Sequence, residues 1–140
     1  MRYQLLDKCW NSLPAPRNGE GKELTLTGAT AMLAVDSDGE PQIICAGGVN
    51  HDIFWDAISG TYSKVAQADY LKKDISWYQF NGCPLTYKLK TERWEILSPK
   101  TPLLARAGAQ VAMRIHTLYY IGGELKPGLR SPGIVQLDLR

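Results

Sequence analysis

The sequence has no long hydrophobic run, which argues against a membrane protein. No stretch approaches the ~20 consecutive apolar residues that a membrane-spanning helix needs, so we expect no membrane partner. The first residues, Met1 to Trp10, contain no apolar core of the kind that a secretory signal peptide carries. We therefore expect no signal peptide in this chain, and the residues themselves leave the cellular compartment open.

Cysteine and histidine are also scarce. The three cysteines, Cys9, Cys45 and Cys83, are odd in number and widely spaced, so neither a disulfide framework nor a zinc pattern is indicated. We expect all three to behave as small apolar residues. The two histidines, His51 and His116, lie far apart without neighbouring ligand residues. The sequence accordingly predicts no metal site.

Charge of one sign is lacking as well. The formal net charge is +2 and no block of lysine and arginine is present, which argues against a nucleic-acid partner. A small acidic ligand stays possible, because one well-placed arginine suffices for it. The chain has 140 residues, of which 44% are hydrophobic and 21% are charged. These values are typical of a globular domain, and we predict a single domain over residues 1–140.

Two pairs of segments repeat along the chain. Residues 28–35 and 108–115 both begin with Gly-Ala, and each is followed by a turn and an apolar segment that ends in two glycines. A second repeat agrees with the first, because Tyr3 precedes Trp10 by the same spacing at which Tyr87 precedes Trp94. Repetition at this scale indicates a propeller or solenoid.

Strand pairs that end in Gly-Gly, followed by a tyrosine strand and a tryptophan strand, are typical of kelch blades. We therefore predict an all-β fold of kelch-type β-propeller blades, with repeats near residues 1–14, 28–97 and 107–140. Between them lies an insert at 55–82, where apolar residues at helical spacing predict one or two short helices at about 55–75. Its aromatic residues either line a ligand site or pack the insert onto the blade, and we favour packing. They are Tyr62, Tyr70, Trp77 and Tyr78.

The number of blades is small for a propeller. Propellers close with ~4–8 blades, whereas the two glycine pairs indicate two to three blades and thus a partial propeller. An open set of blades exposes faces that neighbours should cover. The missing blades would come from the rest of a longer chain or from other copies. We favour a fragment of a longer protein, or one piece of a nicked protein, over a natural partial ring.

The segment Gly122 to Ser131 carries the main chemical signal. Glu124 and Arg130 follow the second glycine pair in a loop that also contains a proline and a glycine. A glutamate and an arginine in a surface loop are commonly a solvated ion pair worth ~0–1 kcal/mol. The same two residues, fixed beside a buried strand end, are also suited to a ligand site.

Several segments together resemble the kelch-type sialic acid mutarotases, also called N-acetylneuraminate epimerases, and in particular their cyclically permuted bacterial relatives. The segments are Gly47 to Asn50, Trp77 to Asn81, Arg106 to Ala109 and, most specifically, Gly123 to Ser131. The resemblance spans roughly residues 28–140. It implies a six-bladed propeller that interconverts the anomers of N-acetylneuraminic acid in its central opening, without a metal or cofactor. It also implies a bacterial protein of a family that is often exported to the periplasm.

The resemblance matches Glu124 and Arg130 to the family's conserved acid and arginine. Mutarotation takes a proton from the anomeric hydroxyl and gives one to the ring oxygen, which a single positioned carboxylate can do, and Glu124 is the candidate. A guanidinium binds the carboxylate of the sugar with two prongs, and Arg130 is the candidate, with Arg106 and Lys126 as weaker ones. Asn50 is predicted either to bind sugar hydroxyls or to act as a turn residue that satisfies its own backbone.

A second function stays open beside the enzyme. Propellers host many unrelated functions, so a non-catalytic kelch module that binds a protein or glycan would have the same fold. The loop from Gly122 to Ser131 favours the isomerase over the binding module.

Overall fold

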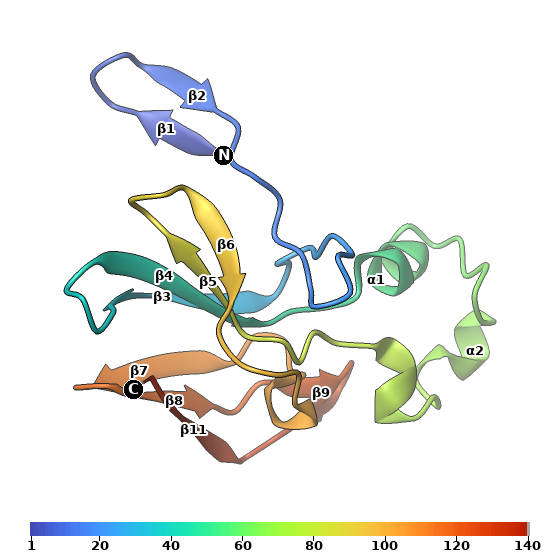
Figure 1. Ribbon diagram of the computed structural model, residues 1–140. Helices are drawn as coiled ribbons and strands as arrows, with labels where there is room; N and C mark the ends of the chain where they lie inside the picture. The colour runs from blue at the N-terminus through green and yellow to red at the C-terminus, as the bar shows by residue number, and fades with distance from the viewer. Residues whose placement is uncertain (140) are drawn as a thin grey trace.

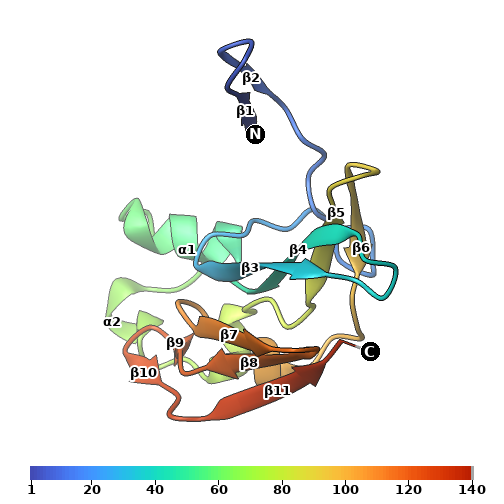
Figure 2. The same cartoon turned by 90° about the vertical axis from the view of Figure 1, so that its left-hand side faces the viewer.

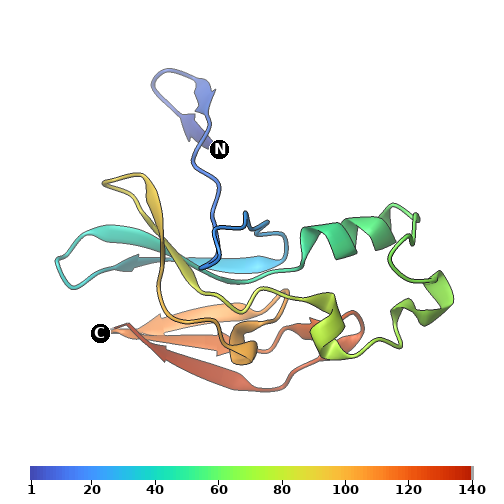
Figure 3. The ribbon, with the colours of Figure 1, turned by 45° about the vertical axis from the view of Figure 1, so that its right-hand side comes forward.

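The computed structural model describes residues 1–139, and most of its regular structure consists of antiparallel β-sheets (Figure 1). Two sheets lie one above the other, short helices extend from one end of them, and an N-terminal hairpin stands apart (Figure 3). Among the described residues, no helix is long and apolar enough to cross a membrane.

The first sheet is a complete four-stranded kelch-type blade, which we call blade I. Its strands are β3 (Ala29–Val35), β4 (Pro41–Gly47), β5 (Leu85–Lys88) and β6 (Arg93–Ile96). They pair in sequence order, β3-β4-β5-β6, and every neighbouring pair is antiparallel. Each strand therefore lies beside the next one along the chain, as the repeat predicted.

The second sheet, blade II, has three strands. They are β7 (Gln110–Arg114), β8 (Thr117–Ile121) and β11 (Ile134–Asp138), with β8 in the middle. The connection from β8 to β11 forms a small hairpin of its own, made of β9 (Glu124–Lys126) and β10 (Leu129–Arg130) (Figure 2). Blade I has its helical insert at the corresponding place, between β4 and β5. Both blades thus carry their longest connection between the second and third strands.

The N-terminal hairpin repeats the outer half of blade I. Its strands are β1 (Arg2–Gln4) and β2 (Cys9–Asn11), which pair only with each other. Tyr3 faces Trp10 with ring centroids 5.1 Å apart, and Tyr87 faces Trp94 at 5.0 Å. The planes of the two ring pairs are inclined by 51° and 52°. The near-identical geometry confirms that these two sequence segments form the same structural unit.

The main core lies between the two blades. β3 and β4 contribute side chains from one sheet and β8 from the other, and the short helix η2 (Pro102–Leu104) adds a fully buried leucine. Along β8 buried and less buried residues alternate, because successive side chains of a strand point to opposite faces. The core residues are Ala34, Ile44, Ala46, Leu104, Ala109, Leu118 and Tyr120.

The insert contains three short helical segments. They are α1 (His51–Ile58), α2 (Gln67–Tyr70) and η1 (Ile75–Tyr78). Helix α1 begins before the predicted boundary because the side-chain oxygen of Asn50 accepts a hydrogen bond from the N–H of Ile53 at 3.1 Å. Tyr78 is 1% exposed and makes edge-on contacts with the rings of Tyr70 and Trp77. The aromatic residues thus pack against one another within the insert, and packing of the insert onto the blade stays a prediction.

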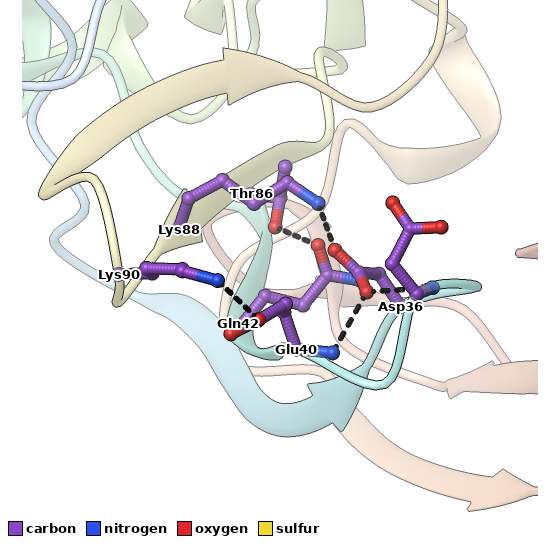
Figure 4. Close-up of polar contacts among 7 residues, drawn as sticks. Asp36, Glu40, Gln42, Thr86, Lys88 and Lys90 are labelled. Atoms are coloured by element: carbon purple, nitrogen blue, oxygen red, sulfur yellow. Dashed lines mark hydrogen bonds and ion pairs between the residues drawn. The ribbon is translucent and has the colours of Figure 1, made fainter.

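Polar contacts tie the two turns at the opposite end of blade I together (Figure 4). Lys88 donates to Asp36 at 2.8 Å, and Lys90 donates to Glu40 at 2.5 Å. The buried Thr86 hydroxyl donates to the side-chain oxygen of Gln42 at 2.8 Å. The β3–β4 turn is therefore fixed to the β5–β6 hairpin by charge and hydrogen bonds.

The cysteines follow the prediction in part. Cys45 and Cys83 are free and buried, and burial raises the pKa of the Cys45 thiol to about 11. Cys9, also free, lies exposed on β2. Cys45 and Cys83 are thus buried as small apolar residues are, whereas Cys9 is exposed because its strand pairs within the outlying hairpin.

Candidate functional site

Both long connections leave their blade through a glycine pair in left-handed conformation. Gly47 has φ of 76°, and a Cβ there would lie 2.3 Å from the carbonyl oxygen of Arg106. Gly123 has φ of 87°, and a Cβ there would lie 2.9 Å from the Cβ of Ala109. Only glycine fits such positions without a backbone shift. The glycine pairs therefore let the two connections start close to the segment that joins the blades.

Glu124 is the first residue of β9, and its backbone is held on both sides. Its N–H donates to the carbonyl of Ala107 at 2.8 Å, and its carbonyl accepts from the N–H of Ala107 at 2.9 Å. The side chain is 37% exposed. The carboxylate thus stands on a fixed backbone while remaining open to a ligand.

Arg130 lies opposite Glu124 in the β9–β10 hairpin. Its Nε is 3.7 Å from Oε1 of Glu124, and its side chain is 84% exposed. An exposed ion pair of this kind is worth ~0–1 kcal/mol, so the guanidinium can leave its partner for another anion at little cost. The structure therefore brings the two predicted catalytic residues together.

Arg106 has a different environment. It is 6% exposed, and its Nη1 donates to the carbonyls of Gly122 and Gly133, both at 2.9 Å. Its guanidinium also lies 5.9 Å from the centre of the Tyr120 ring. The structure places this arginine beneath the loop that carries Glu124.

Asn50 and Lys126 both connect structural elements. Asn50 caps helix α1 with its side-chain oxygen, and its Nδ2 donates to the side-chain oxygen of Gln79 at 3.4 Å. The Nζ of Lys126 donates to the carbonyls of Leu71 and Lys73 at 3.1 Å and 2.7 Å. These lysine contacts join the β9–β10 hairpin of blade II to the insert of blade I.

A cavity of about 1400 Å³ lies between the insert, the β9–β10 hairpin and the connections that enter the two blades. Asn50 and Lys126 line it, together with Leu125 and Leu129 of the hairpin, whereas Glu124 and Arg130 do not. Two cationic residues of the cavity wall, Lys22 and Lys100, were not predicted from the sequence. Each lies in a connection that leads into the first strand of a blade. Such a connection reaches the same end of the blade as the glycine pair, which is the signal that could have identified these residues.

The described residues contain no cluster of three or more His, Cys, Asp or Glu side chains arranged to hold a metal ion. The candidate site therefore consists of the Glu124 carboxylate, the exposed Arg130 guanidinium, and neighbouring amide, ammonium, carboxylate and apolar groups of the cavity wall. The carboxylates of the wall are Glu20, Glu23, Asp52 and Asp74.

The repeated strands, glycine pairs and interblade core define a kelch-type β-propeller protein. The chain belongs to the N-acetylneuraminate epimerase family, because the model of that family matches residues 1–140. This match confirms the resemblance inferred from the loop with Glu124 and Arg130.

Named relatives agree with the family match. The N-acetylneuraminate epimerase of Escherichia coli O9:H4 (strain HS) is 33% identical over 101 residues, covering 66% of this chain and 27% of that protein. The enzyme of that name from Escherichia coli K12 is 31% identical over 104 residues, with the same coverage. The solved structure of YjhT superposes with a TM-score of 0.70 at 27% identity, covering 98% of this chain and 39% of YjhT. The chain thus spans about a quarter of the length of these curated relatives.

Proposed function

We propose that the complete protein is a sialic acid mutarotase that interconverts the anomers of N-acetylneuraminic acid. The observation that carries the proposal is the pairing of Glu124 and Arg130 across the β9–β10 hairpin. The backbone of Glu124 is held by two hydrogen bonds to Ala107, and the guanidinium of Arg130 is exposed. Membership of the N-acetylneuraminate epimerase family supplies the substrate class.

In this mechanism Glu124 moves the protons. Its carboxylate takes the proton of the anomeric hydroxyl and passes a proton to the ring oxygen, directly or through a water molecule, so that the carboxylate is regenerated. The bond between the anomeric carbon and the ring oxygen breaks, leaving a carbonyl and a free hydroxyl. After rotation of the carbonyl, the hydroxyl attacks the other face and the same steps run in reverse. A positioned acid/base group typically contributes ~10²–10⁴-fold.

Arg130 binds the carboxylate that N-acetylneuraminic acid carries beside its anomeric carbon. Two parallel hydrogen bonds from a guanidinium to a carboxylate fix both distance and orientation. The loose contact with Glu124, at 3.7 Å, suits such an exchange of partners. Once Arg130 has turned to the sugar, the Glu124 carboxylate is free to accept a proton.

The other predicted binding residues take supporting roles in the proposal. Asn50 and Lys126 line the cavity beside the hairpin. In the proposal they donate hydrogen bonds to sugar hydroxyls or to the substrate carboxylate. Both already have protein partners, so contact with the sugar requires exchange of those hydrogen bonds. Further blades, from a longer chain or from other copies, complete the pocket in this proposal.

The test is the rate at which α- and β-N-acetylneuraminic acid equilibrate, followed by proton NMR with the complete protein. We expect acceleration over the buffer rate and loss of most of it in Glu124→Gln. In Arg130→Ala most of it should be lost at sugar concentrations below KM. Equal rates with and without the protein would refute the mutarotase. Tight binding of the sugar without acceleration would favour the kelch binding module instead.

A further inference from the structure

The β9–β10 hairpin leaves and re-enters blade II at a narrow neck. Gly122 and Gly133 face each other there, since the N–H of Gly122 donates to the carbonyl of Gly133 at 3.0 Å. Nη1 of Arg106 donates to the carbonyls of both residues. One cationic nitrogen from outside the loop therefore holds the two ends of the loop together.

Blade I holds its insert in the same way with a different side chain. Nδ2 of Asn81 donates to the carbonyl of Gly47 at 3.2 Å and to that of Cys83 at 3.0 Å. These carbonyls occupy the same positions in blade I as those of Gly122 and Gly133 in blade II. In each blade, one carbonyl lies two residues after a strand residue, and the other lies two residues before the residue that pairs with it on the neighbouring strand. The paired residues are Cys45 and Leu85 in blade I, and Tyr120 and Val135 in blade II.

The backbone at Arg106 extends this contact to Glu124. The next residue, Ala107, exchanges two hydrogen bonds with Glu124. On the other side, the carbonyl of Arg106 accepts from the N–H of Gly48 at 2.9 Å. Arg106 therefore links the start of the blade I insert, the neck of the blade II loop and the backbone that carries Glu124.

The burial of Arg106 makes sugar binding a poor explanation for it. Moving a guanidinium out of water is costly unless its hydrogen bonds are replaced. Here Nη1 donates to both neck carbonyls and the Tyr120 ring lies alongside, whereas the buried Nε has no hydrogen-bond partner among the described residues. Arg106 is 6% exposed, whereas the side chains of Glu124 and Arg130 are 37% and 84% exposed. A side chain in this position acts on a ligand only through the loop above it.

We propose that Arg106 is a positioning residue that closes the neck of the loop from Gly122 to Gly133 and thereby fixes Glu124 and Arg130. The inference rests on the proposed mutarotase for its effect on rate. The closure itself rests only on the contacts of Arg106 with the neck. It replaces the role that the sequence suggested for Arg106, which was direct contact with the sugar.

The experiment uses the complete protein with Arg106→Lys and Arg106→Met, and with Arg114→Met as a control at an exposed arginine of β7. Hydrogen exchange of the amides of Gly122, Glu124 and Ser131 is measured by mass spectrometry. Loss of the hydrogen bonds from Arg106 to the neck carbonyls should speed their exchange by about 10-fold or more. The β7 and β8 amides should keep the wild-type rate. The lysine variant should retain part of the protection, because it keeps a cationic donor.

Kinetics of anomer equilibration provide the second readout. Misplacement of Glu124 lowers kcat, and we expect a loss of about 10- to 100-fold in kcat in Arg106→Met. Because the same neck also fixes Arg130, any rise in KM should come together with faster exchange at the neck. A raised KM with wild-type exchange at the neck would overturn the proposal and make Arg106 a sugar contact. If the wild-type protein does not accelerate equilibration, the mutarotase fails, whereas the exchange data still decide whether Arg106 closes the neck.

A measurement on the wild-type protein keeps the test decisive if removal of the buried arginine prevents folding. The N–H of Gly122 donates to the carbonyl of Gly133, which also accepts from Nη1 of Arg106. A closed neck should therefore protect the Gly122 amide as strongly as the amides of β8. Exchange of Gly122 at the rate of an unprotected amide would overturn the closure.

Discussion

The two blades hold the necks of their loops by corresponding carbonyl pairs, but they use different side chains from different places. In blade I the donor is Asn81, which belongs to the insert that it closes. In blade II the donor is Arg106, which belongs to the connection between the blades. The blade I neck is therefore closed from within, whereas the blade II neck depends on how the blades are joined.

The loops also differ in what their charged side chains do. In the blade I insert, Asp56 accepts hydrogen bonds from Ser63 and Lys64, and these donors hold the pKa of its carboxyl below the usual range. In the short blade II hairpin, Arg130 is 84% exposed with one loose partner, Glu124. In the insert, Asp56 thus holds the chain to itself, whereas in the hairpin the guanidinium of Arg130 stays available to a ligand.

Replacement of Glu124 should have the largest effect, because only the blade II hairpin carries the proposed acid/base group. In Glu124→Gln the side chain keeps its size and loses its base, so the catalysed equilibration rate should fall by ~10²–10⁴-fold. Proton NMR of the anomers measures the rate, and Glu95→Gln on the exposed outer strand of blade I is the control. Full activity in Glu124→Gln would remove the chemical distinction between the loops.

Replacement of Arg130 should have the next largest effect. Loss of a hydrogen bond to a charged group is worth ~1.5–3 kcal/mol, so Arg130→Ala should weaken sugar binding by about 10- to 100-fold. The effect should appear mainly in KM, and Arg130→Lys should recover part of it. An unchanged KM would mean that the exposed guanidinium is only the surface partner of Glu124.

Much of this comparison was visible in the sequence. The spacing of Tyr3 to Trp10 and of Tyr87 to Trp94 predicted two equivalent hairpins, because each pair must meet across a turn. The glycine pairs predicted equivalent strand ends. Patterns of this kind are local, so one sequence contains all the information that they need.

The roles of Arg106 and Asn50 were harder to predict. An arginine before small residues looks the same whether it faces a pocket or lies buried under a loop. Arg106 is buried because the Gly122 and Gly133 carbonyls converge on it after folding. Asn50 offered a ligand contact or a turn, and it caps α1 because the chain turns into a helix directly after the glycine pair. The site roles of both residues remain predictions.

Removal of Asn81 tests whether the blade I neck is closed independently. Asn81→Ala leaves two partly buried carbonyls without their donor, which should lower the free energy of unfolding by ~1–3 kcal/mol. Urea denaturation measures this change, with Asn11→Ala on the outlying hairpin as the control. Amide exchange at Glu124 should stay at the wild-type rate. Faster exchange there would show that the two necks are coupled.

The smallest expected effect lies at the other end of blade I, where no loop of the site is involved. The ammonium of Lys88, with the N–H groups of Glu40 and Asp38, holds the pKa of the Asp36 carboxyl below its ordinary value. A carboxyl whose pKa is lowered by folding stabilises the fold above its unfolded pKa, and this contribution disappears as the pH falls through the lowered folded pKa.

The stability difference between wild type and Asp36→Asn should therefore be constant above about pH 5 and should shrink as the pH falls below about 4. Thermal denaturation across this range measures it, with Asp38→Asn on the same turn as the control. Activity at neutral pH should be unchanged, because the turn lies at the far end of the sheet from the glycine pairs (Figure 1). A pH-independent difference would mean that Asp36 acts on stability as a turn residue, through the backbone N–H groups that it accepts from, without its charge.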